Sequence, residues 1–184
     1  MYPDLVEAQA RGVRTVLQAP LFEGIHVPGR LERIPHPAGV HVYVDYAHTP
    51  HALETVLRAL TDLHGSPICV VFGCGGGRDR GKRPAMGAIA ARYARDVFLT
   101  SDNPRDEDPE RILLDIAQGI GSRSPRVVAE PDRREAIRSA LRTVRQGEVL
   151  LVAGKGHETE QIVGGRVIPF DDRTILREEI ARTV

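Results

Sequence analysis

Residues 40–73 read VHVYVDYAHTPHALETVLRALTDLHGSPICVVFG, and this stretch decides the fold class. Its first part, VHVYVDY, is β-branched and aromatic, which is typical of a strand. In its middle part, apolar residues recur at helical spacing (Leu53, Val56, Leu57 and Leu60). The apolar run ICVVFG follows as a second strand. A strand, a helix and a strand in this order predict two parallel strands joined by a crossover helix.

The same alternation continues to the end of the chain. Further strands are expected at 96–102, 126–131 and 148–154, with helices at about 84–95, at 109–120 and after the capping residue Asp132. The run VLLVA suits a strand covered on both faces. QIVGGRVIPF predicts a two-strand ribbon, and DDRTILREEIAR a closing helix. We therefore expect an α/β fold with a doubly wound, mostly parallel, Rossmann-like sheet, helices on both faces and a small terminal β-ribbon.

The composition excludes several classes of protein. A chain of 184 residues can bury roughly 70% of its unfolded surface without a metal or disulfide. Its 25 Lys and Arg residues equal its 25 Asp and Glu residues, which argues against a nucleic-acid binder. There is neither a signal-peptide pattern nor an apolar run of about 20 residues, so a cytoplasmic protein without a membrane span is expected. Cys69 and Cys74 are predicted to be buried, reduced thiols, with a redox or metal pair as the alternative.

Four polar clusters each follow a predicted strand: DYAHTP, GCGGGRDRGKRP, SDNPR and AGKGHE. In open α/β sheets, ligands bind outside the carboxyl ends of the strands. This coincidence predicts a functional site at that edge of the sheet.

The glycine-rich cluster indicates an anion site. Glycines let backbone N–H groups approach an anion closely, and a helix start favours negative charge. Arg78, Arg80, Lys82 and Arg83 add cations. The pattern GxxxxGK[ST] is absent, so a nucleotide γ-phosphate would need groups from elsewhere. A solvated basic turn is the alternative.

The clusters SDNPR and AGKGHE suit a zwitterionic amino acid. Arg105 can hold a carboxylate with two parallel hydrogen bonds, while Asp102 and Asn103 can take an ammonium group. Gly154 allows a tight turn, and Glu158 offers a further carboxylate at the same edge. The alternatives are an Asx-Pro turn with a capping Asp and a plain strand-to-loop turn.

The cluster DYAHTP suits a nucleotide. Asp45 can bond a ribose hydroxyl or a metal-bound water, and Tyr46 or His48 can lie against a purine. Arg30 stands just before this strand. A helix cap and a solvated arginine are the alternatives, and His157 is interpreted as structural rather than as a base.

Taken together, these stretches resemble one family. The order GR-x-E, VDYAHTP, FGCGG-x-RD-x-GKRP, SDNPR, DR-x-x-AI, LVAGKGHE and FDD is similar to that of the UDP-N-acetylmuramoyl-tripeptide synthetases of the Mur ligase family, over about residues 28–184. The resemblance implies an ATP-dependent amide ligase of peptidoglycan synthesis. ATP phosphorylates the carboxylate of a UDP-muramoyl-dipeptide, and the amino acid's nitrogen then attacks the acyl phosphate with the assistance of Mg²⁺.

The resemblance also implies roles for particular residues. Those expected to hold meso-diaminopimelate are Arg78, Asp102, Asn103, Arg105, Gly154 and Glu158. Those expected at ATP are Arg30 and Asp45, with Tyr46 and His48 as further candidates. Arg78 would grip the side-chain carboxylate with Arg105 and Asn103, and Gly154 and Glu158 would meet the distal ammonium. Gly77 departs from the family, which often has Asp or Asn there.

The family's other parts have no counterpart in this sequence: a domain for the UDP-sugar, and a central domain with a GTNGKT-type phosphate loop, a carbamylated lysine and the magnesium ligands. Residues 1–30, with a short helix at about 3–12, are interpreted as a linker and a remnant of that central domain, and residues 31–184 as the amino-acid-binding domain. We expect no catalytic residue, metal site or tightly bound cofactor here, because ATP, Mg²⁺ and the UDP-muramoyl-dipeptide would be held with the missing domains. A stand-alone binding module and an enzyme half working in trans are the alternatives.

Overall fold

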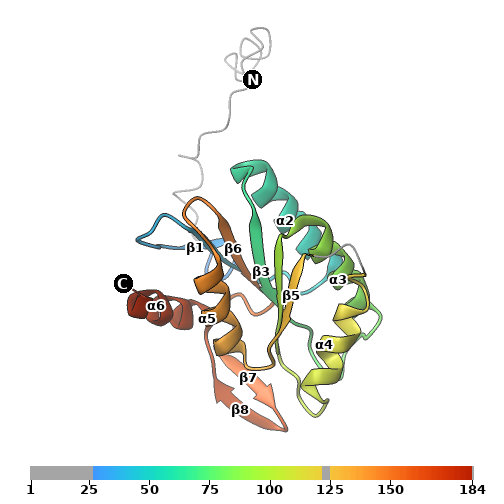
Figure 1. Ribbon diagram of the computed structural model, residues 1–184. Helices are drawn as coiled ribbons and strands as arrows, with labels where there is room; N and C mark the ends of the chain where they lie inside the picture. The colour runs from blue at the N-terminus through green and yellow to red at the C-terminus, as the bar shows by residue number, and fades with distance from the viewer. Residues whose placement is uncertain (1–26, 122–124, 184) are drawn as a thin grey trace, which may run out of the picture.

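The computed structural model describes residues 27–121 and 125–183. The helix predicted at 3–12 and most of the segment 1–30 lie outside these residues. One sheet has the strand order β1-β2-β6-β3-β4-β5 (Figure 1). Its strands are β1 (Glu32–Ile34), β2 (His41–Asp45), β3 (Ile68–Phe72), β4 (Asp96–Leu99), β5 (Arg126–Ala129) and β6 (Val149–Ala153). All neighbouring pairs are parallel except β1 with β2.

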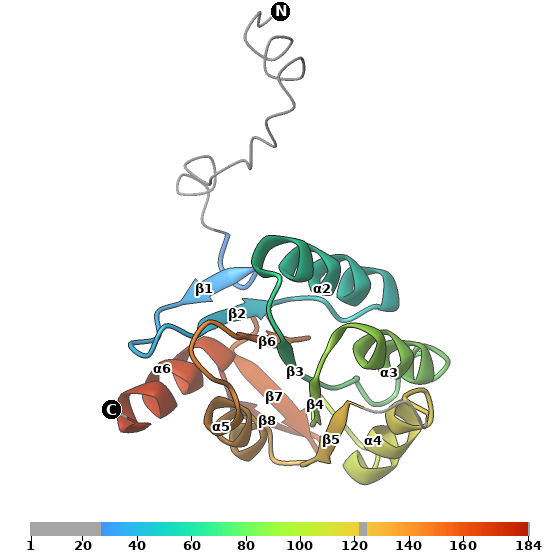
Figure 2. The ribbon, with the colours of Figure 1, turned by 45° about the horizontal axis from the view of Figure 1, so that its top comes forward.

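Helices cover both faces of this sheet (Figure 2). They are α2 (Pro50–His64), α3 (Lys82–Tyr93), α4 (Pro109–Ala117), α5 (Arg133–Thr143) and α6 (Asp172–Thr183). A separate antiparallel ribbon is formed by β7 (Glu160–Val163) and β8 (Arg166–Pro169). The doubly wound α/β fold with a terminal ribbon, expected from the sequence, is confirmed.

Two apolar cores lie on opposite faces of the sheet. In the central strand β6, Leu151 packs with α2, α3 and α4, whereas Leu150 and Val152 pack with α5 and α6. Successive side chains of a strand point to opposite faces, so an apolar strand without alternation must be covered twice. The run VLLVA is fully buried for this reason.

The boundaries of most elements agree with the sequence prediction, and so does the Asp132 cap, whose carboxylate accepts from the N–H groups of Arg134 and Glu135. The predicted strands at 96–102 and 126–131 were too long, because Leu99 and Ala129 end the pairing and the chain then turns. The helix predicted at 109–120 ends at residue 117. Strand β1 was missed, because three residues are too few to show a periodicity.

Both cysteines are free and buried, as predicted. Burial raises the pKa of the Cys74 thiol to about 11 and raises that of Cys69 further. Among the helices in the described ranges, none is long and apolar enough to cross a membrane.

Candidate functional site

The ends of four adjacent strands bring the polar clusters together. Asp45 pairs with Ala153 across β2 and β6, so the DYAHTP cluster begins beside Gly154. Phe72 pairs with Leu99 across β3 and β4, so the glycine-rich loop begins beside the segment that leads to SDNPR. The edge predicted from the sequence therefore exists, with all four clusters on it.

Two glycines let the glycine-rich loop lie directly on the segment after β4. A Cβ on Gly73 would fall 1.9 Å from the Thr100 carbonyl oxygen, and one on Gly76 would fall 1.9 Å from that of Pro104. Real Cβ atoms do not approach that closely, so only glycine fits at these positions. The contact holds the two loops in a fixed relation.

Arg78 and Arg105 both lie next to Gly75. A Cβ built on Gly75 would be 2.9 Å from Arg105 Nη1 and 3.7 Å from Arg78 Cγ. Arg105 Nη1 donates to the Gly76 carbonyl at 2.7 Å, whereas Arg78 is exposed and has no hydrogen bond or ion pair with the described residues. Both arginines therefore stand at this loop, and the Arg78 side chain is free to take an anion.

Arg105 also anchors the loop through its backbone. Its φ of +55° is left-handed, which is uncommon for a residue with a side chain. The strain is offset by pairing with the ribbon, because its N–H donates to the Ile162 carbonyl at 2.9 Å and its carbonyl accepts from Gly164 at 2.6 Å. The ribbon thereby fixes the backbone of Arg105 and the direction in which its side chain starts.

Asn103, Lys155 and Glu158 form one hydrogen-bonded group. Glu158 accepts from Asn103 Nδ2 at 2.9 Å and from Lys155 Nζ at 3.0 Å. Asn103 Oδ1 accepts from Lys155 Nζ and from the Ile162 N–H. Burial disfavours the charged form of Glu158, but the bonds from Lys155 and Asn103 outweigh it and hold its pKa below the ordinary value. Glu158 is therefore an ionised carboxylate at neutral pH.

Asp102 is the carboxyl group of this region that has no cation of its own within the described part of the chain. Glu158 is paired with Lys155, and Asp172 with Arg133. Asp102 is only 7 % exposed, and no hydrogen bond or ion pair from the described residues reaches its carboxylate. Its Oδ2 lies 3.0 Å from where a Cβ on Gly154 would stand. Burial raises the pKa of Asp102, and the charges of Arg133 and Lys155 oppose that rise. A bound ammonium group would supply the cation that the Asp102 carboxyl lacks and would favour its ionised form.

The residues predicted for a nucleotide gather at the end of β2. The Arg30 guanidinium lies 4.7 Å from the centre of the Tyr46 ring. The rings of His48 and His157 lie 4.5 Å and 5.1 Å from that of Tyr46. Asp45 is buried, and its two oxygens accept backbone N–H bonds, so it shapes this turn. His157 was interpreted as only structural, and the fold adds it to the cluster.

The partners of two buried cations could not be found from the sequence, and one of these cations, Lys155, was not singled out at all. Lys155, inside the quoted AGKGHE cluster, is fully buried, although lysine is rarely buried without a partner. Arg83 was expected among the cations of an anion site, but it is fully buried and donates to Glu107, to Asp115 and to the Gly75 carbonyl, so it is not free to take an anion. Both residues stand inside motifs that the sequence shows. Most of their hydrogen-bond partners lie 24 or more residues away in the chain, so spacing alone could not predict which groups they bind.

The backbone conformation at Gly77 explains why glycine stands where the family often has Asp or Asn. Its φ is +61°, and a Cβ there would meet nothing within 4 Å. Glycine, asparagine and aspartate are the residues that adopt this conformation most readily. The position therefore has room for the Asp or Asn of the family, and its conformation favours glycine.

The hollows of the surface do not by themselves mark the site. The larger, of about 680 Å³, is lined by Arg95, Arg126 and Arg142 among others and lies at the opposite edge of the sheet. A smaller one of about 430 Å³ adjoins Ser101 and Pro104. Within residues 27–121 and 125–183, no group of three or more His, Cys, Asp or Glu side chains is arranged to hold a metal.

Most of the chain is similar to known proteins. A family model described as "Mur ligase, glutamate ligase domain" matches residues 29–156. The UDP-N-acetylmuramoyl-L-alanyl-D-glutamate–2,6-diaminopimelate ligase of Lawsonia intracellularis is 50% identical over 152 residues, which cover 83% of this chain and 31% of that protein. A solved structure of a ligase with the same name matches with a TM-score of 0.80 and 44% identity, over 88% of this chain and 33% of that one.

A more distant structure shares the fold alone. It is a bifunctional folylpolyglutamate synthase/dihydrofolate synthase from Yersinia pestis, complexed with AMPPNP and a Mn ion, with a TM-score of 0.58 and 16% identity. The match covers 88% of this chain and 33% of the synthase chain. The chain thus spans about a third of the length of the relatives that it matches. Because the family model covers well over half of its residues, the chain belongs to the Mur ligase family, in its glutamate ligase domain.

Proposed function

We propose that this chain is the part of an ATP-dependent ligase that selects meso-diaminopimelate for addition to UDP-N-acetylmuramoyl-L-alanyl-D-glutamate. The relatives at 44% to 50% identity carry that activity in their names. The observation that carries the proposal is that cations and carboxyl groups stand at separate positions along one edge of the sheet. Arg78 and Arg105 stand at the glycine-rich loop, while Asp102 lies beside Gly154, with Glu158 among the charged groups around it.

This arrangement suits an amino acid that carries both an ammonium and a carboxylate at its far end. A carboxylate between Arg78 and Arg105 would gain charge-assisted hydrogen bonds. The ammonium would face Asp102 and Glu158, which supplies the cation missing from that group. Lysine has the distal ammonium but lacks the distal carboxylate. The chain should therefore prefer meso-diaminopimelate over lysine, because lysine leaves the arginines without an anion.

Titration calorimetry with meso-diaminopimelate and with L-lysine tests the proposal. Arg78→Ala and Arg105→Ala should each weaken binding of meso-diaminopimelate by about 1.5–3 kcal/mol, the usual contribution of a hydrogen bond to a charged group. Arg80→Ala is the matched control, since Arg80 belongs to the same loop but pairs with Asp115 on α4. Equal or absent binding of the two amino acids would refute the proposed selection.

The cluster around Tyr46 is proposed to receive ATP. A purine fits the partly exposed ring beside Arg30, His48 and His157. Asp45 lies buried at the same turn, from which its carboxylate fixes the backbone that would border the ribose. When bound, ATP supplies the phosphoryl group that activates the acceptor carboxylate. The residues of this chain would orient the nucleotide and the incoming amine.

We further propose that the chain by itself does not hydrolyse ATP and acts in the cytoplasm. Its 184 residues contain no GxxxxGK[ST] loop, and buried free thiols suit a reducing compartment. A binding module without catalysis is the rival function, as is an enzyme half that works in trans. ADP release measured with this chain alone, and after mixing with a separate phosphate-loop domain of the family, distinguishes these possibilities.

A further inference from the structure

Arg133 and Asp172 form a fully buried ion pair behind the site. They open the helices α5 and α6 and belong to the DR-x-x-AI and FDD motifs, which so far have no assigned role. Arg133 Nε donates to Asp172 Oδ1 at 2.8 Å, and Arg133 Nη2 donates to Oδ2 at 2.7 Å. Both side chains are at most 1 % exposed. A buried pair of this kind contributes little net stability compared with apolar residues of similar size, which raises the question of its use.

The other bonds of Arg133 reach the ends of two strands. Nη1 donates to the Ser101 carbonyl at 3.3 Å, and Nη2 donates to the Ala153 carbonyl at 3.0 Å. Ser101 immediately precedes Asp102, and Ala153 immediately precedes Gly154. One planar guanidinium therefore ties together the backbone on both sides of the proposed ammonium position.

The same guanidinium dominates the charges around Asp102. The charged groups that face this carboxylate are Arg133 of α5, Asp172 of α6, and Lys155 and Glu158 of the segment between β6 and β7. Burial works against the ionised form of Asp102, and Arg133 is the strongest group that opposes this effect. The ion pair thus holds the backbone next to Asp102 and also favours the ionised form of its carboxyl group.

We propose that Arg133, oriented by Asp172, is a positioning residue of the amino-acid site that holds Asp102 and Gly154 toward the ammonium group of the bound amino acid. This inference rests on the proposed function. It adds a residue that would not touch the ligand and acts only through the strand ends. The bidentate bond to Asp172 fixes the plane of the guanidinium, so the two carbonyl contacts keep their geometry.

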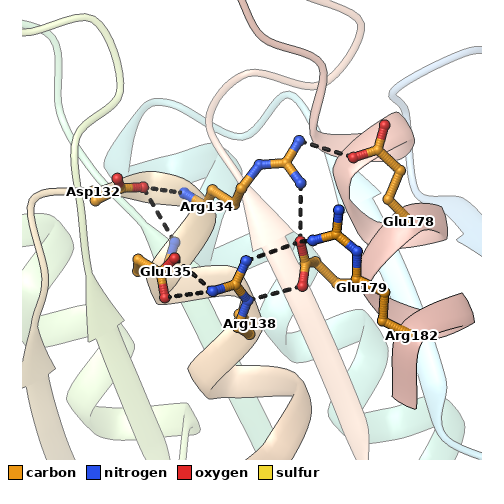
Figure 3. A network of polar contacts seen from close by, with 7 residues as sticks. All are labelled: Asp132, Arg134, Glu135, Arg138, Glu178, Glu179 and Arg182. Carbon is orange, nitrogen blue, oxygen red and sulfur yellow. Dashed lines mark hydrogen bonds and ion pairs between the residues drawn. The ribbon is translucent and has the colours of Figure 1, made fainter. Parts of the chain in front are cut away.

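A second group of charges joins the same two helices without reaching the site. Arg134 and Arg138 of α5 pair with Glu178 and Glu179 of α6, and Arg182 adds a further contact to Glu179 (Figure 3). The guanidinium of Arg134 donates to Glu178 and Glu179 of α6. Arg134→Met is therefore a matched control, which loosens the contact between α5 and α6 but leaves the ends of β4 and β6 untouched.

The test uses the variant Arg133→Met/Asp172→Leu, which removes both charges together. Replacing a buried pair by apolar residues of similar volume is often tolerated, whereas removing one partner leaves a buried charge. The dissociation constant for meso-diaminopimelate, measured by calorimetry, should rise about tenfold or more, the effect of losing well-placed charged hydrogen bonds at the ligand. In Arg134→Met it should stay within about twofold of the wild-type value.

A second readout separates positioning from a general loss of structure. Carboxylate NMR should show Asp102 titrating at higher pH in the double variant than in the wild type, and at an unchanged pH in Arg134→Met. If the double variant does not fold, Arg133→Lys takes its place. It keeps the charge, so the titration of Asp102 should stay near that of the wild type, but it loses the planar fork, so binding should still weaken.

The outcomes distinguish the two proposals. If the wild-type chain prefers meso-diaminopimelate and the Arg133 variants bind it equally well, the positioning role is wrong and the proposed function stands. If Arg134→Met weakens binding as much as the double variant, the effect is a general loosening of the helices and the positioning role is again wrong. If the wild-type chain binds neither amino acid, the proposed function fails, and this inference fails with it.

Discussion

Arg83→Met should destabilise the protein in a way that depends on pH. The Arg83 side chain is fully buried between α3 and the turn before α4. Its guanidinium donates to both oxygens of Glu107 at 2.8 Å and 2.7 Å and to Asp115 at 2.9 Å. Methionine keeps the apolar stem but leaves both carboxylates without this partner.

The magnitude follows from the pKa of Glu107. This pKa is lowered from 4.5 to about 2, and the largest cause is the hydrogen bonds from Arg83, with smaller contributions from the Gly77 N–H and Arg80. At 1.36 kcal/mol per unit, the full shift corresponds to roughly 3 kcal/mol. The side chains of Glu107 and Asp115 are 21% and 25% exposed, so solvent screening reduces the expected loss to about 1–2 kcal/mol at neutral pH. Part of that loss is offset, since Arg83 Nε is buried without a partner among the described residues.

Because the folded-state pKa of Glu107 is depressed, its contribution is present above pH 4.5 and is lost as the pH falls through about 2. Urea unfolding followed by circular dichroism between pH 7 and pH 2.5 should show a steeper loss of stability in the wild type than in Arg83→Met. Arg80→Met is the control, because Arg80 bonds the same Asp115 from a side chain that is 62% exposed and should cost under about 0.5 kcal/mol. Equal losses in the two variants, or an unchanged pH slope in Arg83→Met, would refute the reasoning.

Two further predictions concern the loop and the core. Gly76→Ala should lower the free energy of unfolding, measured by thermal unfolding, by about 2–3 kcal/mol, because its Cβ would fall 1.9 Å from the Pro104 carbonyl oxygen. Gly81→Ala is the control and should cost less than about 1 kcal/mol, because its nearest neighbour is the end of a flexible side chain. Similar losses in both variants would contradict the close approach of the two loops. Cys69 and Cys74 should react with Ellman's reagent only after unfolding in denaturant, since both are buried and burial raises the pKa of both thiols; rapid reaction of either in the native protein would show that it is accessible.

Much of the fold could be predicted because it depends on local patterns. The run VLLVA at 149–153 had to be covered on both faces, and the helical spacing after Pro50 required a buried face. The termination of strands could not be predicted as well. Residues 100–102 are Thr, Ser and Asp, with no Gly or Pro to mark the end of a strand, yet they leave the sheet and turn toward the site. The short edge strand β1 depends on its partner β2.

Some residues of the candidate site could be predicted from the sequence and others could not. The motif order pointed to Asn103, Arg105 and Glu158 before any contact was known, and the structure brings them to one edge. Lys155 and Arg133 were passed over although each stood inside a quoted motif. Their importance lies in burial and in partners from distant segments, and neither property can be read from a single residue's neighbours in the sequence.

The sequence by itself determined which chemical groups stand at the ends of the strands, because alternation of strands and helices forces the carboxyl ends of parallel strands onto one edge. Only the tertiary structure decided which of those groups are already paired. Lys155 is bound to Glu158 and Arg133 to Asp172, so Asp102 is left as the carboxylate without a partner among the described residues. Charge pairing depends on distances of a few ångströms between segments that are far apart in the chain, and these distances are set by packing rather than by sequence order.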